Sequence, residues 1–537
     1  MLNTYTYPGF PYVQSEDQKS GKVTRKPVVI AGGGPIGLTM ALDCAHQGIS
    51  VIVLDDNNTV SVGSRAVCYA KRPLEVWDRL GCAAEMIDKG IVWKVGKVFR
   101  EEDLVYQFDL LPEEDHKIPA FINLQQYYLE EYMIERTKEY GDLIDLRWKH
   151  KVISAHNEDG YVALQVETPD GVFAMECDWL IACDGANSDV RKMLGGEFKG
   201  QFFQDRFLIA DVVMKADFPT ERWFWFDPPF HPKQSVLLHK QADDVWRIDF
   251  QLGWDADPVE EKKPENVIPR LKAMLGEDTE FELEWVSVYQ FACRRMDTFR
   301  YGNVLFAGDS AHQVSPFGAR GANTGVQDVD NLAWKLKMVM DGKAPDALID
   351  SYSEERVYAA DDNLLNSTRS TDFITPKSEV SRSFRNAVLE LSHDFPFARP
   401  LVNSGRLSTP TPYLDSSLNT ADEDHFTGQM LPGTNCADAP VVKDGEDGWL
   451  LNSLGDRFVA LVYGDDPGVD SLDVDGVAVE VLVIGDDFED ARGRIEARYD
   501  MRPGTTYLIR PDQHVAARWR AFDADKITAA VNRALCR

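Results

Sequence analysis

A glycine-rich turn between two apolar runs constrains the fold of this chain more than any other feature. Residues 28–30 are apolar and lead into Gly32, Gly34 and Gly37, after which a helical pattern and a second apolar run over residues 51–54 follow. This order predicts a strand–turn–helix–strand unit with the GxGxxG fingerprint of dinucleotide-binding folds. The first glycine permits the tight turn, the second lets a pyrophosphate approach the backbone, and the third lets helix and strand pack closely.

The two ends of this unit carry groups that suit a dinucleotide. Pro35 is expected in the first turn of the helix, whose free N–H groups would face an anion. Asp55 ends the second apolar run, and a carboxylate about 20 residues beyond the glycines can bind ribose hydroxyls and disfavours a 2′-phosphate. The turn does not distinguish FAD from NAD, and a crossover without any ligand is the alternative interpretation.

Length and charge limit the remaining possibilities. A chain of 537 residues predicts three or four units at about 150 residues each. Its 57 Lys and Arg against 88 Asp and Glu give a net charge of −31, which disfavours nucleic acid and anionic membranes as partners. Eight cysteines without CxxC spacing, and ten histidines without a ligand motif, predict a cytoplasmic protein with reduced thiols and no metal site.

Two later segments also join an apolar strand to an acidic turn. Residues 178–182 precede Asp184 and Gly185, and residues 302–307 precede Gly308 and Asp309, with a helix predicted over residues 324–336. Either segment alone is as well explained by an ordinary strand and turn. Their order after the glycine-rich unit makes chance a poor explanation.

Together the three motifs resemble the class A flavin-dependent aromatic hydroxylases, the group that contains p-hydroxybenzoate hydroxylase and phenol hydroxylase. The similarity continues through residues 334–336 and 352–356. It implies an α/β fold: a GR2-type, Rossmann-like FAD-binding domain, an interleaved antiparallel-sheet substrate domain and a C-terminal thioredoxin-like domain. It also implies FAD as cofactor and NADH or NADPH as transient reductant.

The resemblance assigns roles to several polar residues. Asp309 would hold the ribitol of FAD, the turn at Asp184 would lie near the pyrophosphate, and Arg65 would lie over the phosphates unless it is a solvated cation. Gln126 matches the glutamine of a Gln-x-x-x-Glu motif, with Gln125 as the alternative register. The complete cofactor set is Gly32, Gly34, Pro35, Gly37, Asp55, Arg65, Gln126, Asp184, Gly185, Gly308, Asp309, Pro316, Gly321, Ala322 and Asn323.

The substrate side is expected in residues 201–289. Residues 235–240 and 245–252 alternate around a turn at 242–244, which predicts a β-hairpin, and the resemblance implies that its sheet covers the flavin. The predicted pocket residues are Trp223, Trp225, Leu237 and Phe317. The predicted catalytic residues are His239, Tyr289, Arg320 and Pro316, with His239 or Tyr289 as the phenol base. Plain core packing is the alternative for each aromatic residue. A surface position or a hydrogen-bonded core position is the alternative for His239, and Arg320 would either bind an anionic substrate group or brace its loop.

The implied reaction is hydroxylation of a small phenolic or related ring by O2 through a C4a-hydroperoxyflavin. A homodimer is one option for the assembly. A halogenase or dehydrogenase on the same fold is the nearest alternative, and a non-catalytic escort or binding protein is a more distant one.

The predicted domain boundaries follow these motifs. Residues 510–512 match an element of the thioredoxin-like domain in the phenol hydroxylase branch, and the absence of CxxC there predicts a structural role. The boundaries are 1–25 for an N-terminal arm, 26–200 and 290–362 for the FAD-binding domain, 201–289 for the substrate sheet, 363–423 for a helical connector and 424–537 for the thioredoxin-like domain.

Overall fold

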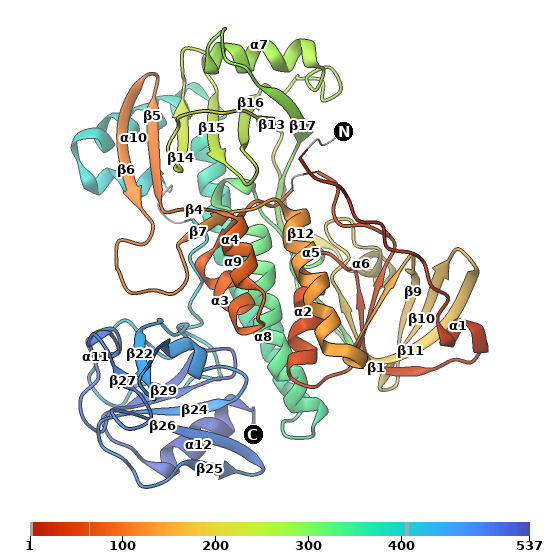
Figure 1. Cartoon of the computed structure of the whole chain (residues 1–537), viewed down its shortest axis with the longest axis vertical. Coiled ribbons are helices and arrows are strands. Elements are labelled where there is room, and N and C mark those ends of the chain that lie inside the picture. The colour runs from red at the N-terminus through yellow and green to blue at the C-terminus, as the bar shows by residue number, and fades with distance from the viewer. Residues whose placement is uncertain (1–3, 64, 403–406) are drawn as a thin grey trace.

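Three sheet-centred bodies, joined by long helices, make up the structure (Figure 1). It is a computed structural model that describes residues 4–63, 65–402 and 407–537. In the view of Figure 1 the first body lies at the right and centre, the second at the top, and the C-terminal body at the lower left. The predicted mixed α/β fold is confirmed. Within the described ranges, no helix is long and apolar enough to cross a membrane.

The first body is built on an eight-stranded sheet whose strands β20, β11, β1, β2 and β8 pair in parallel in that order. Its strands are β1 (Arg25–Ala31), β2 (Val51–Asp55), β8 (Ile144–Trp148), β9 (Lys151–Glu158), β10 (Tyr161–Thr168), β11 (Gly171–Ala182), β19 (Arg300–Tyr301) and β20 (Val304–Phe306). Both faces of the parallel strands are buried, which explains their continuous apolar runs.

Helices surround this sheet, and two small sheets lie beside it. The helices are α1 (Glu16–Ser20), α2 (Pro35–His46), α3 (Lys71–Arg79), α4 (Ala83–Lys89), α5 (Gln126–Thr137), α6 (Asp189–Met193), α8 (Gly321–Met340) and α9 (Ala347–Ile374). The small sheets are β3 (Cys68–Ala70), β7 (Phe121–Asn123) and β4 (Ile91–Trp93), and β12 (Phe198–Phe202), β18 (Ala292–Met296) and β21 (His312–Gln313). The helix predicted from residue 324 therefore begins three residues earlier, at Gly321.

The second body is a seven-stranded sheet in the order β17-β13-β16-β15-β14-β5-β6. Its elements are β5 (Val95–Arg100), β6 (Asp103–Asp109), β13 (Arg206–Val213), β14 (Arg222–Phe226), β15 (Ser235–Lys240), β16 (Val245–Leu252), β17 (Glu282–Tyr289) and α7 (Pro264–Leu275). The predicted hairpin is β15 and β16, and Asp243 and Asp244 in its turn both have positive φ, as a type I′ turn requires. Because β5 and β6 join this sheet, the predicted range of 201–289 for the substrate sheet was too short.

The C-terminal body has a five-stranded sheet in the order β25-β26-β24-β28-β29. Helix α9 runs through the predicted boundary at residue 362, and α10 (Glu379–Asp394) follows it. Of the predicted connector, residues 403–406 lie outside the described residues. The remaining elements are β22 (Pro440–Lys443), β23 (Glu446–Trp449), β24 (Phe458–Tyr463), β25 (Ser471–Val474), β26 (Val477–Ile484), β27 (Glu489–Asp490), α11 (Arg494–Tyr499), β28 (Thr506–Ile509), β29 (Val515–Trp519) and α12 (Ala524–Ala534).

The described part of the N-terminal arm packs along the first body and reaches the second. Phe10 stacks on Trp148, with ring centroids 4.5 Å apart. The backbone N–H of Thr4 donates to Glu284 Oε1 of β17 at 2.9 Å. The arm therefore bridges the two bodies at the side where β17 ends the antiparallel sheet.

Candidate functional site

Three turns meet at one edge of the parallel sheet. Ala31 at the end of β1 pairs with Ala182 at the end of β11, which in turn pairs with Phe306 at the end of β20. The residues that follow these strands belong to the three motifs predicted from the sequence. Ligands of open parallel sheets bind at this carboxyl edge, so the topology brings the predicted cofactor residues together.

The glycine turn between β1 and α2 is shaped for close approach. Gly32 has a φ of +104°, and a Cβ there would lie 2.5 Å from the carbonyl oxygen of Cys183. A Cβ at Gly37 would lie 1.9 Å from the carbonyl oxygen of Gly32, so only glycine lets α2 pack against the turn. Gly34 is the N-cap of α2, and a Cβ there would have no other atom within 4 Å. That open space at a helix N-terminus fits a phosphate.

Three carboxylates surround this turn. Asp55 Oδ2 accepts a hydrogen bond from the Gly33 N–H at 2.6 Å. Asp184 Oδ2 accepts from the Val190 N–H at 3.0 Å, but its Oδ1 is buried and has no partner in the described ranges of the chain. Desolvation by the surrounding chain raises the pKa of Asp184 and of Asp309. Hydroxyl donors of a ligand would satisfy the orphaned oxygen, which is how a ribityl or ribose group fits this site.

The Gly308 turn is held from beneath by a buried carboxylate. Asp328 Oδ2 accepts from the Gly308 N–H at 2.8 Å and contacts His312 Nε2 at 2.7 Å. Arg356 Nε donates to the other oxygen of Asp328 at 2.6 Å. This network fixes the turn and leaves the Asp309 side chain exposed toward the site.

Gln126, the first residue of α5, binds the loop that carries Arg65. Its Oε1 accepts from the Ala66 N–H at 3.1 Å, and its Nε2 donates to Glu130 at 2.8 Å. Gln125 instead donates to the carbonyl of Ala242 in the hairpin turn. The structure thus places Gln126, and not Gln125, in the register of the Gln-x-x-x-Glu motif, while Arg65 is exposed.

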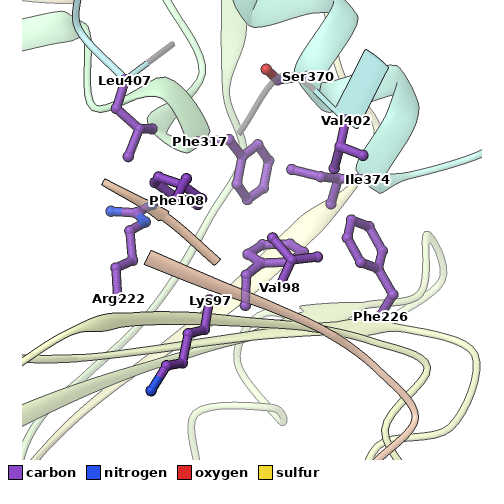
Figure 2. Close-up of a pocket in the computed structure, with 11 residues that line it drawn as sticks. Lys97, Val98, Phe108, Arg222, Phe226, Phe317, Ser370, Ile374, Val402 and Leu407 are labelled. Atoms are coloured by element: carbon purple, nitrogen blue, oxygen red, sulfur yellow. The ribbon is translucent and has the colours of Figure 1, made fainter. Parts of the chain in front are cut away.

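An aromatic cavity lies between the antiparallel sheet and the turn that begins at Pro316 (Figure 2). The hollow measures about 480 Å³ with its open mouth included. Phe317 of the turn faces Phe226 of β14 across it in Figure 2. The lining consists of Lys97, Val98, Phe108, Arg222, Phe224, Phe226, Phe317, Ser370, Ile374, Val402 and Leu407.

Polar residues share the cavity face of the sheet. Arg247 Nε donates to Asp211 Oδ1 at 2.9 Å. His239 is buried, and neither of its ring nitrogens has a hydrogen-bond partner among the described residues. Asp249 Oδ1 is also buried and has no partner in that part of the chain, and burial raises the pKa of Asp249 to about 6. Orphaned polar atoms on one face of a sheet indicate that a ligand completes their hydrogen bonds.

The sequence profile of a family described as "FAD binding domain" matches residues 25–367. The 6-methylpretetramide 4-monooxygenase of Streptomyces rimosus is 28% identical over 536 residues, which cover 94% of this chain and 92% of that protein. The chain belongs to the class A flavin-dependent aromatic hydroxylases.

Two further comparisons agree with this family assignment. The para-nitrophenol 4-monooxygenase of Pseudomonas sp. strain WBC-3 is 30% identical over 339 residues, covering 61% of this chain and 82% of that protein. The solved structure of the anhydrotetracycline hydroxylase OxyS from Streptomyces rimosus superposes with a TM-score of 0.72 at 26% identity, covering 96% of this chain and 99% of that one.

Two residues that were predicted to line the substrate pocket, Trp223 and Trp225, do not border the cavity. Trp225 packs on the opposite face of the sheet, with its ring centroid 5.1 Å from that of Phe99. Trp223 Nε1 donates to Glu221 Oε2 at 2.7 Å. We therefore replace them with Phe224 and Phe226, which line the cavity.

Of the other residues predicted for the substrate pocket and the flavin loop, some border the cavity and others do not. Leu237 is on the cavity face but does not border the cavity, whereas Phe317 does. Arg320, the N-cap of α8, is buried and donates to Asn363 Oδ1 at 3.0 Å, so it braces the loop rather than facing the cavity. The Asn323 side chain donates to the carbonyl of Cys68 and accepts from the N–H of Ala70 in β3.

The pKa values of the two predicted proton acceptors, His239 and Tyr289, do not suit that role. Burial, followed by the charges of Arg222 and Arg247, holds the pKa of His239 well below its usual range. Burial and the neighbouring Asp249 hold the pKa of Tyr289 well above its usual range. Asp249, which sequence reasoning missed, is better suited as an acceptor. A signal for it existed, because polar residues recur at every second position of β16, at Arg247, Asp249 and Gln251.

Proposed function

We propose that this hydroxylase uses FAD, NADH or NADPH, and O2 to hydroxylate a small phenolic or related electron-rich ring. The aromatic cavity carries this proposal, because Phe317 on its wall belongs to the loop that follows the predicted cofactor turn at Gly308. A planar ring stacks well among phenylalanines. The names of the two monooxygenase relatives, which denote action on para-nitrophenol and on 6-methylpretetramide, support this class of substrate.

The residues at the sheet edge fit FAD. The open N-terminus of α2 suits its phosphates, and Asp184 and Asp309 suit its hydroxyl groups. When bound, FAD would supply the redox chemistry, which is reduction by NADH or NADPH and activation of O2 at flavin C4a.

The chain itself positions the ring, excludes water and moves a proton. We assign the phenolic proton to Asp249, whose carboxyl lies on the cavity face of β16 and has an unpartnered buried oxygen. Its pKa of about 6 lets it accept a proton at neutral pH and release it again. The phenylalanines of the cavity would keep water from the reacting centre.

We also propose that the C-terminal body is a thioredoxin-like domain with a structural role. Strand β26 pairs in parallel with β24, and β28 and β29 follow antiparallel on the other side, which is the strand order of that fold. Strand β25 replaces a helix in the crossover between β24 and β26. Cys436 is buried in the core of this body, and Cys536 has no CxxC partner, so no dithiol supports a redox role.

A substrate panel tests the proposed reaction. The purified protein, loaded with FAD, is assayed with phenols, halide ions and non-aromatic alcohols, and both NAD(P)H oxidation and products are measured. Phenol-dependent oxidation of NAD(P)H together with a hydroxylated product is the expected result. Halogenated or dehydrogenated products without hydroxylation would replace this proposal with one of the two enzymatic alternatives.

An Asp309→Ala variant is expected to bind FAD about 10- to 100-fold more weakly than the wild type, because it loses a charged hydrogen-bond acceptor. Titration of the apoprotein with FAD, followed by quenching of flavin fluorescence, measures this. Asp278→Ala removes an exposed carboxylate of the second body and serves as the control. Equal FAD affinities of the two variants would contradict the assignment of Asp309.

A further inference from the structure

Arg222 is a buried cation in a cavity lined mainly by aromatic and aliphatic side chains. Only 8% of the residue is exposed, and Figure 2 shows its guanidinium beside Phe108, at the end of the cavity away from Phe226. Its partner on β5 is Gly96, and a Cβ there would lie 2.1 Å from the Phe108 ring. The missing side chain at Gly96 thus makes room for Phe108 next to the guanidinium.

Arg222 has no carboxylate partner among the described residues, unlike the cations around it. Its one hydrogen bond to a side chain in the described ranges is a 3.5 Å contact from Nη1 to Cys68 Sγ, a weak acceptor. In contrast, Lys97 pairs with Glu221 at 2.7 Å, and its ammonium points away from the cavity in Figure 2. Arg247 pairs with Asp211.

A buried charge without a partner is unfavourable, and proteins seldom retain one unless another ion compensates it. The neighbouring His239 carries no negative charge in either protonation state, so it cannot compensate Arg222. Asp249 acts on Arg222 electrostatically, but within the described ranges it forms no salt bridge with the guanidinium, and its Oδ1 has no hydrogen-bond partner there. The N–H donors of Arg222 are therefore left for an anionic group that enters the cavity.

We propose that Arg222 binds an anionic oxygen group of the substrate, so that the preferred substrates are phenols that also carry a carboxylate or a comparably acidic group. This inference rests on the proposed function. A guanidinium presents parallel N–H donors to two oxygens of such a group. The anion would lie at the Arg222 end of the cavity, and the ring would extend toward Phe317 and Phe226.

Binding of matched ligand pairs tests this inference without turnover. The FAD-loaded enzyme is titrated, in the absence of NAD(P)H, with hydroxyphenyl carboxylic acids of three chain lengths and with their uncharged amides, and the change in the flavin absorbance spectrum gives Kd. The wild type is expected to bind at least one acid about 10- to 100-fold more tightly than its amide.

Three variants locate this preference. Arg222→Met should bring the acid-to-amide ratio to within about threefold of unity, and Arg222→Lys should restore part of it, because charge without the planar fork remains. Lys240→Met removes a positive charge of the same sheet that is paired with Asp244 at 2.9 Å and is not among the residues that line the cavity, so it should keep the wild-type ratio. FAD content and circular dichroism confirm that each variant is folded.

The outcomes separate this inference from the proposed function. Equal affinity of the wild type for every acid and its amide would overturn the inference, even if Arg222→Met failed to fold. A preference that Arg222→Met retains or Lys240→Met abolishes would overturn it as well. If phenols without an acidic group are hydroxylated equally well, the proposed function stands and the inference fails. If no member of the panel changes the flavin spectrum or accelerates NAD(P)H oxidation, the proposed function itself fails.

Discussion

An Asp249→Asn variant is expected to lose about 100- to 10,000-fold in kcat/KM for phenolic substrates at pH 7, the range contributed by a positioned proton acceptor. Asparagine keeps the size of the side chain and removes its ability to take a proton. The register places Asp249 opposite Leu237, which lies opposite Phe224 of the cavity wall. The side chain therefore lies on the same face of the sheet as Phe224, two strands away from it, and is not itself one of the residues that line the cavity.

The pKa of Asp249 determines the direction in which the rate should change with pH. Because burial raises the pKa of Asp249 to about 6, the wild-type rate should fall as the pH drops through about 6 and the carboxylate becomes protonated. The variant should lack that inflection. The rate of the variant should instead rise as the free phenol ionises, which for an unsubstituted phenolic group occurs at about pH 10. Measurements of kcat/KM from pH 5 to pH 10 distinguish the two profiles.

Two neighbouring variants provide the controls. His239→Gln and Tyr289→Phe remove groups that are respectively neutral and protonated at pH 7. The inflection near pH 6 should remain in both variants. If Asp249→Asn kept the inflection and His239→Gln removed it, the histidine would be the proton acceptor.

Local turn chemistry explains why parts of this fold are predictable from sequence. The hairpin of β15 and β16 was predicted with its observed bounds, because Asp243 and Asp244 tolerate positive φ between two alternating strands. The glycine turn after β1 is equally local, since the space at Gly32 and Gly37 admits no side chain. Such signals require no knowledge of distant residues.

The cavity face of β14 was not predictable in this way. Residues 223–226 read Trp-Phe-Trp-Phe, so apolar side chains occupy both faces and alternation does not show which pair faces the cavity. The answer depends on β5, which joins β14 from more than a hundred residues earlier in the chain and places Gly96 beside Arg222. The same long-range pairing explains why the predicted substrate domain lacked β5 and β6.

The second large effect is expected far from the cavity, where the C-terminal body meets α8 and α9. Arg510 Nη1 donates to Glu355 Oε1 at 2.7 Å and its Nε donates to Asp512 Oδ1 at 3.0 Å. All three side chains are buried. Arg510→Ala should destabilise the protein by about 3–5 kcal/mol, because it leaves two buried carboxylates without their shared counter-charge.

Urea denaturation and limited proteolysis measure this loss, because a multi-domain chain need not unfold in one step. Burial alone would raise the pKa of Glu355, but the charges of Arg510 and Lys335 outweigh burial and hold it well below its usual range. The wild-type stabilisation from this carboxylate is therefore present at neutral pH and is lost as the pH falls below about 4. The difference between wild type and variant should shrink over the same interval.

An exposed pair in the same body supplies the matched control. Arg457 and Glu480 form an ion pair in which both side chains are more than a third exposed, so Arg457→Ala should cost less than about 1 kcal/mol. Similar losses in the two variants would show that the buried cluster does not hold the C-terminal body in place.

A double variant separates charge from packing in the buried cluster. Adding Asp512→Asn to Arg510→Ala should recover part of the loss, since Asp512 is the carboxylate whose pairing arginine has been removed, whereas Glu355 keeps its salt bridge to Lys335 at 2.7 Å. Recovery would assign the destabilisation to unpaired charge, whereas additive losses would assign it to packing alone. Glu355 precedes Arg356, which holds Asp328 beneath the Gly308 turn. Weakened FAD binding in Arg510→Ala would therefore show that the C-terminal body supports the cofactor site.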